Sequence, residues 1–203
     1  MFDATTLAES LVDAPSPAAK LTLSRRLSRF GLPALRLARA RGVRVVALAR
    51  GERYTARSPR LRDLAPHLDT WPAPPAGLFV VEERTAYLRS RSPLAVAHEF
   101  GHALDCALGD GGYRSSEDRD LRTIYFTATS FITPYAATAP DEFFAEIVRA
   151  YVEANDHRSP WPAATRHRLR DVDVRAFDYV ERLFARDFIQ ALTIGAPRAY
   201  STP

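Results

Sequence analysis

The chain has 203 residues, of which 46% are hydrophobic, 26% are charged and a single one, Cys106, is a cysteine. This composition predicts one compact domain with a sizeable core, and it excludes both a disordered chain of low hydrophobicity and a disulfide scaffold. The 28 Lys or Arg against 24 acids give a formal net charge of +4, and no apolar run approaches bilayer length.

The amino-terminal third of the chain is basic. Residues 1–62 contain 13 Lys or Arg and 4 acids, whereas residues 63–203 contain 15 and 20. The arginines stand singly, without interleaved aromatic residues, so solvated helix faces are the favoured interpretation and a nucleic-acid partner is not expected. A docking surface for anionic lipid or an acidic protein stays open as the minority interpretation.

Helical periodicity appears first near residues 3–12, 17–30 and 33–41. We take residues 1–30 as a basic helical extension and residues 31–203 as the main domain.

The middle of the chain alternates short strands and turns. Strands are expected near residues 43–49, 78–83 and 86–89, and the proline-rich segment 71–77 is expected to form a rigid loop that enters the second strand. Helices are expected near residues 93–108, 115–129, 140–154 and 173–191. A small mixed sheet followed by a helical half predicts a mostly helical α+β fold.

Two histidines stand one helical turn apart with a glutamate between them: His98, Glu99 and His102. They lie in a predicted helix that begins at Ser92-Pro93 and ends at Gly109. Its apolar residues share one face, while both histidines and Asp105 share the other. Two solvated histidines would be the ordinary interpretation of this spacing alone, but the intervening glutamate favours a zinc site in which that glutamate is the general base.

A third ligand is needed, because catalytic zinc binds three protein groups and one water. The helix expected to begin at Pro140 has an apolar stripe, and Glu142 and Glu146 lie opposite that stripe, one turn apart. In isolation these acids indicate a solvated face on which Glu146 and Arg149 form a weak i, i+3 pair. Alongside the histidine motif, Glu142 becomes the candidate third ligand.

These segments resemble the anthrax lethal factor-like metallopeptidases, a family that includes the Pro-Pro endopeptidases. The similarity covers His98-Glu99-Phe100-Gly101-His102-Ala103-Leu104-Asp105 and Glu142-Phe143-Phe144-Ala145-Glu146, and Tyr135 stands seven residues before Glu142, as the active-site tyrosine does in that family. It extends at the level of pattern over about residues 31–190.

The resemblance implies a zincin-like catalytic domain, of the type with a glutamate ligand, that acts as a zinc-dependent endopeptidase. His98, His102 and Glu142 would bind Zn²⁺, Glu99 would be the general base, and Tyr135 would stabilise the oxyanion. Glu146 looks like the outer carboxylate that orients a ligand imidazole. Asp105 is a weaker candidate for similar support, and a salt-bridged acid at the helix end is an equal alternative.

The expected partner is a peptide or protein substrate. An edge strand at residues 78–81 would let an extended peptide add to the sheet, which favours an endopeptidase. Family members cut either between prolines or in host signalling proteins, as toxins do, so the resemblance does not select a substrate. The alternative is a non-catalytic zincin-fold module that docks protein, nucleic acid or membrane through its basic amino-terminal region. No signal peptide is recognisable, and the compartment and oligomeric state stay open.

Overall fold

The computed structural model describes residues 3–156 and 163–193. Its sheet has the strand order β1-β2-β4-β3, formed by β1 (Val12–Asp13), β2 (Arg44–Ala47), β4 (Thr85–Leu88) and β3 (Gly77–Val80). The first three strands are parallel and β3 runs antiparallel to β4. A mostly helical chain with a small mixed sheet confirms the predicted fold class.

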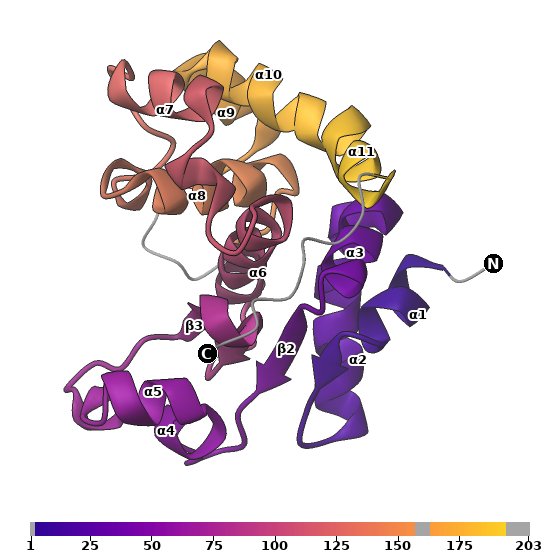
Figure 1. The fold of residues 1–203 in the computed structure, drawn as a ribbon, viewed down its shortest axis with the longest axis vertical. Helices are drawn as coiled ribbons and strands as arrows, with labels where there is room; N and C mark the ends of the chain where they lie inside the picture. Colours follow the sequence, from indigo (N-terminus) through magenta and orange to yellow (C-terminus); the bar gives the residue numbers. More distant parts are fainter. Residues whose placement is uncertain (1–2, 157–162, 194–203) are drawn as a thin grey trace.

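The helices lie on two sides of a central helix, α6 (Pro93–Leu108) (Figure 1). On one side lie α1 (Ala4–Glu9), α2 (Pro17–Leu27) and α3 (Gly31–Ala40), and on the other lie α7 (Arg119–Phe126), α8 (Pro140–Tyr151), α9 (Arg166–Val172) and α10 (Val174–Arg182). A π-helical turn, Leu183–Asp187, leads from α10 into α11 (Phe188–Thr193), which returns to α3. No helix among the described residues is long and apolar enough to cross a membrane.

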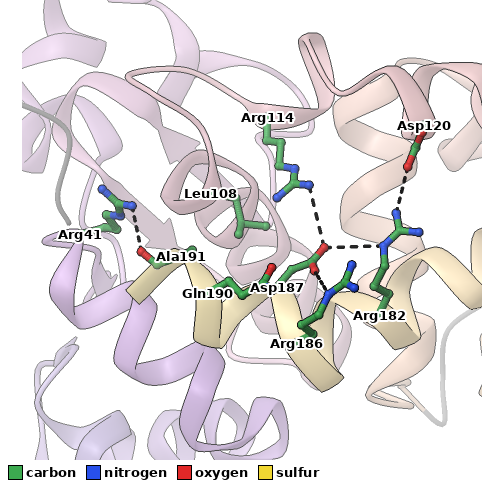
Figure 2. A pocket seen from close by; sticks show the side chains of 9 residues that line it. All are labelled: Arg41, Leu108, Arg114, Asp120, Arg182, Arg186, Asp187, Gln190 and Ala191. Carbon is green, nitrogen blue, oxygen red and sulfur yellow. Dashed lines mark hydrogen bonds and ion pairs between the residues drawn. The ribbon is translucent and has the colours of Figure 1, made fainter. Parts of the chain in front are cut away.

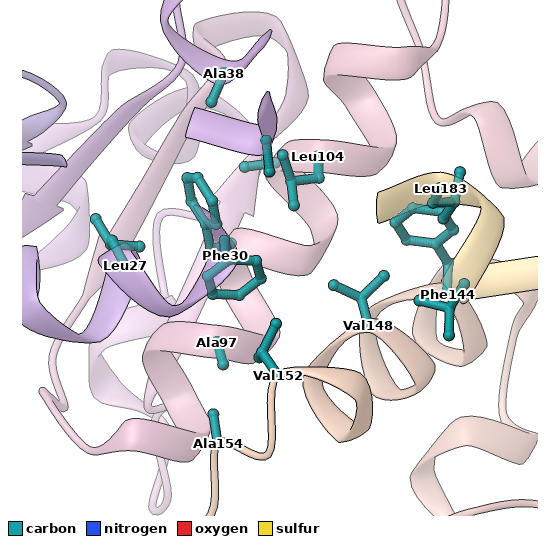
Figure 3. Close-up of a cluster of buried hydrophobic side chains, with 14 of the residues drawn as sticks. Leu27, Phe30, Ala38, Ala97, Leu104, Phe144, Val148, Val152, Ala154 and Leu183 are labelled. Carbon is teal, nitrogen blue, oxygen red and sulfur yellow. The ribbon is translucent and has the colours of Figure 1, made fainter. Parts of the chain in front are cut away.

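The residues on both sides of position 30 belong to one hydrophobic core. Leu27 and Phe30 are buried together with residues of α6 and α8, and the rings of Phe30 and Phe100 lie 4.8 Å apart (Figure 3). Strand β1 also comes from this amino-terminal stretch and pairs with β2. The segments before and after residue 30 therefore pack around the same core, and the division at residue 30 stays a prediction.

Helix α6 has the bounds that the sequence predicted. The Ser92 side chain accepts from the Ala95 amide at its start, Pro93 occupies the first turn, and Gly109 follows its last residue. Every residue from Ala95 to Ala107 is buried, including both histidines. The polar face therefore lies inside the molecule, against α8, β3 and the segment that follows α6.

Other predicted helix bounds were wrong, because the helices end earlier than expected or contain an irregular turn. The expected helix at 3–12 ends at Glu9, because the next residues form β1, and the one expected at 115–129 is the shorter α7. The helix expected at 173–191 contains the π-helical turn. The sequence analysis also missed α9 and two short helices, α4 (Tyr54–Arg57) and α5 (Pro59–Leu64), which are too short to show a periodic stripe.

Helices α6 and α8 approach each other closely at Gly101. A Cβ atom at this position would lie 2.8 Å from Cα of Ala145, which real Cβ atoms essentially never do. Only glycine therefore permits this crossing, and Ala145 stands between Glu142 and Glu146 on the facing helix.

We expect Gly101→Ala to lower stability by about 1–3 kcal/mol, because overpacking at the crossing exceeds the roughly 1 kcal/mol that alanine gains in helix propensity. Thermal unfolding of the metal-free protein measures the change. Gly112→Ala is the matched control, since nothing lies within 4 Å of its added Cβ. A Gly101→Ala protein that melts at or above the wild-type temperature would show that the crossing is loose.

Candidate functional site

The predicted ligands His98, His102 and Glu142 come together between α6 and α8. Nε2 of His98 lies 3.0 Å from Oε2 of Glu142, Nε2 of His102 lies 3.2 Å from the same oxygen, and the two Nε2 atoms are 3.2 Å apart. Donors placed tetrahedrally around an ion at 2.0–2.2 Å are about 3.3–3.6 Å from each other. The three groups therefore converge nearly as a metal requires, and they could hold a metal ion.

Glu146 contacts the opposite side of the His98 ring. Its Oε1 is 3.0 Å from Nδ1 of His98, so the imidazole lies between the two glutamates of α8. Because a carboxylate only accepts, Nδ1 is the nitrogen that keeps its proton, and Nε2 is the one that can bind a metal. The outer position predicted for Glu146 therefore has the geometry that orients a ligand.

Two further residues that the sequence analysis did not assign to the site hold Glu146. Arg149 donates from Nε and Nη2 to the two oxygens of Glu146 at 2.8 and 2.7 Å, and Thr133 donates its hydroxyl to Oε2 at 2.7 Å. All three side chains are buried. Glu146 and Arg149, which the sequence taken alone indicated as a solvated pair, thus form a bidentate ion pair in the interior. Their i, i+3 spacing was the only feature of the sequence that indicated an interaction between them.

Arg149 is itself anchored from the far side. Its Nη1 donates to the Ala154 carbonyl at 3.3 Å and to the Asn155 side chain at 3.0 Å. A chain of hydrogen bonds therefore runs from His98 through Glu146 and Arg149 to the loop beyond α8.

Burial and hydrogen bonding oppose each other in this cluster. Burial disfavours the imidazolium, but hydrogen bonds to Glu142 and Glu146 outweigh it and raise the pKa of His98 to about 10. Burial likewise opposes the ionised carboxylates, yet bonds from His98 and Arg149 lower the pKa of Glu146 to about 2, and bonds from both histidines lower the pKa of Glu142. In the metal-free protein a proton on His98 thus competes with any metal.

The predicted general base, Glu99, lies between α6 and the edge strand β3. A Cβ at Gly77 would lie 2.5 Å from Cγ of Glu99, so β3 can pass over this carboxylate only because residue 77 is glycine. Burial raises the pKa of Glu99, while electrostatic interactions with the two neighbouring imidazoles and a hydrogen bond from the Phe79 amide counteract part of that rise. A buried carboxylate with a raised pKa is suited to exchange protons.

Tyr135 lies at the rim of the site, in a 3₁₀ turn before α8. Its hydroxyl donates to Oε1 of Glu142 at 3.0 Å, its ring centroid lies 5.3 Å from that of His98, and 45% of the residue is exposed. Burial and the charge of Glu142 raise its pKa, so its hydroxyl remains a donor at neutral pH.

Asp105 lies in α6 as predicted but makes its hydrogen bonds with Ser115. It accepts from the Ser115 amide at 2.8 Å and from the Ser115 hydroxyl, and burial raises its pKa to about 7. Nδ1 of His102 is buried without a hydrogen-bond partner among the described residues. The structure thus brings Asp105 near the site without a bond to a ligand imidazole.

Tyr113 is a residue of the site that the sequence did not reveal. Its ring lies 5.5 Å from that of His102 and 6.3 Å from that of Phe79, between α6 and β3. It follows the Gly109–Gly112 turn that ends α6, and no helical or strand pattern marks it.

A cavity of about 340 Å³ opens beside the ligands. Its wall includes Glu99 and Tyr135, and the remaining lining is mostly apolar or paired: Pro75, Ala76, Gly77, Leu94, Ala95, His98, Glu146 and Arg149. Glu146 and Arg149 neutralise each other, so their part of the wall carries little net charge.

Comparison with solved structures shows that the fold is similar to that of a Pro-Pro endopeptidase from Paenibacillus alvei, PPEP-2. The TM-score is 0.63 at 20% sequence identity, and the match covers 87% of this chain and 99% of the other. No protein-family model matches the sequence. No curated protein matches it significantly. The likeness therefore concerns the fold, and the arrangement of side chains has to carry the chemistry.

We expect Thr133→Val to weaken binding of a metal ion at His98 by about 10–100-fold, with Zn²⁺ as the probe, because Glu146 would lose one of the hydrogen bonds that hold it at Nδ1 of His98. Competition with a fluorescent chelator measures the dissociation constant. Thr22→Val, in an exposed turn of α2 whose hydroxyl bonds only the Ala18 carbonyl, is the matched control. Equal zinc affinity in the two variants would mean that Thr133 does not position the ligand.

Proposed function

We propose that this protein is a zinc-dependent endopeptidase. The observation that carries the proposal is the convergence of His98, His102 and Glu142 on one point with Glu99 and Tyr135 beside it. Two imidazoles and one carboxylate form a donor set that catalytic zinc sites use, and the distances between the donors fit such an ion. A zinc ion bound there would supply a Lewis acid that polarises the peptide carbonyl and acidifies a water.

The residues around the ion would move protons and hold charge. Glu99 accepts the proton of the attacking water and later delivers it to the leaving amine, a role for which its burial and raised pKa suit it. The Tyr135 hydroxyl, which donates to Glu142 in this structure, would donate instead to the oxygen that becomes negatively charged. Glu146, held by Arg149 and Thr133, keeps His98 in the orientation that binds the metal.

Strand β3 is the natural place for the substrate backbone. Within the described sheet it is an edge strand, and its bonds to β4 alternate: the Arg89 amide donates to the Ala76 carbonyl, and Leu78 stands opposite Tyr87. The backbone groups of Gly77 and Phe79 therefore face away from β4, and the Phe79 amide bonds Glu99 while the other groups are directed to the edge. An extended peptide that adds here would cross the site without needing a free terminus, which supports an endopeptidase.

The cavity favours a small apolar residue in that peptide. Pro75, Ala76, Leu94 and Ala95 give it an uncharged wall. The similar fold belongs to a protein named for cleavage at Pro-Pro sequences. Proline-containing peptides are thus the first arm of a substrate screen, and peptides with basic or large side chains are the second.

The decisive experiment uses Glu99→Gln. We expect wild type and Glu99→Gln to bind one zinc per chain by elemental analysis, and the variant to lose nearly all cleavage of a broad peptide library, because Glu99 moves protons without binding metal. His98→Ala should lose both zinc and activity. Wild type that takes up no stoichiometric zinc would contradict the metal site. Fully loaded wild type that cleaves no peptide would instead favour the non-catalytic binding module.

A second variant tests Tyr135. If its hydroxyl stabilises only the transition state, Tyr135→Phe lowers turnover by about 10²–10³-fold while zinc content and KM change little. Steady-state kinetics on the best library peptide separate the two parameters. A loss of turnover below about fivefold would reject this role and leave the zinc site standing.

A further inference from the structure

A second cavity, of about 420 Å³, lies away from the candidate metal site (Figure 2). It is formed where the end of α3, the segment after α6, and the helices α10 and α11 meet, and its lining residues are Arg41, Leu108, Arg114, Asp120, Arg182, Arg186, Asp187, Gln190 and Ala191. Leu108 stands six residues after His102, about 9 Å along α6. The cavity therefore needs an explanation of its own.

Four arginines and two aspartates line this cavity, a surplus of two positive charges. Three of the guanidinium groups lie around the buried Asp187: Arg186 is 3.2 Å, Arg182 3.7 Å and Arg114 3.9 Å from its carboxylate. Each guanidinium carries five N–H donors, and a carboxylate accepts about four hydrogen bonds. Among the described residues each of the four guanidinium groups makes one hydrogen bond, so most of their donors remain unused.

Arg41 is the least compensated of the four. Its residue is 8% exposed, Nη2 donates to the Ala191 carbonyl, and Nη1 is buried without a hydrogen-bond partner. No carboxylate of the described residues lies within ion-pair distance of it, whereas Arg114, Arg182 and Arg186 each have one. Burial, together with the charge of Arg84, lowers the pKa of Arg41, and the more distant charge of Asp110 counteracts only part of this effect. A buried cation without a counter-ion is costly unless an anion approaches it.

The backbone around the cavity is also irregular. Residues Leu183–Asp187 form a π-helical turn, which ends at Asp187 and contains Arg186. π-Helical turns are rare, and they frequently mark functional sites. Here the turn interrupts the long carboxyl-terminal helix at the point where its arginines gather, although uninterrupted α-helix was expected from the sequence.

We propose that this cavity binds a small polyvalent oxyanion, such as a phosphate ester, through Arg41, Arg114, Arg182 and Arg186. Guanidinium groups match the oxygen pairs of phosphates and carboxylates, and two surplus charges suit a ligand with at least two negative ones. A volume of 420 Å³ lies in the range of small-molecule sites, which favours a small ligand over a nucleic acid, since a nucleic acid needs an extended basic tract.

The test is calorimetric titration of the zinc-free full chain at low ionic strength, since phosphates also bind zinc. Pyrophosphate, inorganic phosphate and citrate are the probes, so that phosphate and carboxylate ligands are distinguished. We expect saturable one-site binding of pyrophosphate that weakens as salt is added.

Variants that are expected to change the affinity in opposite directions make the test specific. Arg186→Gln should weaken pyrophosphate binding by about tenfold or more, because it removes charge-assisted hydrogen bonds, and Arg41→Gln should do the same. Asp120→Asn, an exposed position whose charge opposes the ligand, should tighten binding by about threefold or more. Arg168→Gln and Arg39→Gln, at exposed positions outside the cavity, are the matched controls and should bind as wild type.

Two results would overturn the proposal. One is the absence of saturable binding below about 10 mM for every probe, a level that would exclude even weak specific recognition. The other is an equal loss of affinity in the cavity variants and in Arg168→Gln, which would mean diffuse attraction to a basic protein. Circular dichroism will show whether Arg41→Gln folds. If it does not, Arg186→Gln and Asp120→Asn still decide the outcome. Arg186→Gln is expected to fold, because Arg114 and Arg182 remain beside Asp187.

Discussion

The close crossing of α6 and α8 at Gly101 is the contact on which the candidate site depends. The two glutamates that contact His98 stand more than forty residues from it in the sequence, and only the docking of α8 against α6 brings them there. Since Glu142 and Glu146 are one helical turn apart, a single docking event places one carboxylate at Nε2 and the other at Nδ1 of the same imidazole. A wider spacing of the helices would separate all these pairs at once.

This arrangement places charges in the interior, and the network around Glu146 explains how the fold tolerates them. Breaking a buried ion pair typically costs about 3–5 kcal/mol, because the remaining charge is left without a partner. Here both oxygens of Glu146 are bonded, to His98, Arg149 and Thr133, and Arg149 is bonded in turn to Ala154 and Asn155. These hydrogen bonds stabilise the buried charges, and they also fix the direction in which Nε2 of His98 points.

Sequence patterns predicted the parts of this structure that local chemistry determines. The Ser92-Pro93 start and the Gly109 stop gave the bounds of α6, and the opposed faces of two helices indicated which histidines and glutamates would meet. Tertiary contacts decided the rest. Nothing local distinguishes the buried pair of Glu146 and Arg149 from a solvated one, and the requirement for glycine at position 77 follows from a side chain 22 residues away. Tyr113 likewise meets His102 and Phe79 only when β3 docks beside α6, and Thr133 meets Glu146 only when the segment before α8 packs against that helix.

The segment that follows α6 runs from the candidate metal site to the arginine-lined cavity. Within a few residues it places Tyr113 against His102 and Phe79, and Arg114 in the wall of the arginine-lined cavity. Ser115 then ties the segment back to α6 through two hydrogen bonds to the buried Asp105. These bonds hold the backbone beside Arg114 in a fixed position relative to α6. The role of Asp105 in this structure is therefore to hold the segment that carries Tyr113 and Arg114 against the helix that carries the histidines.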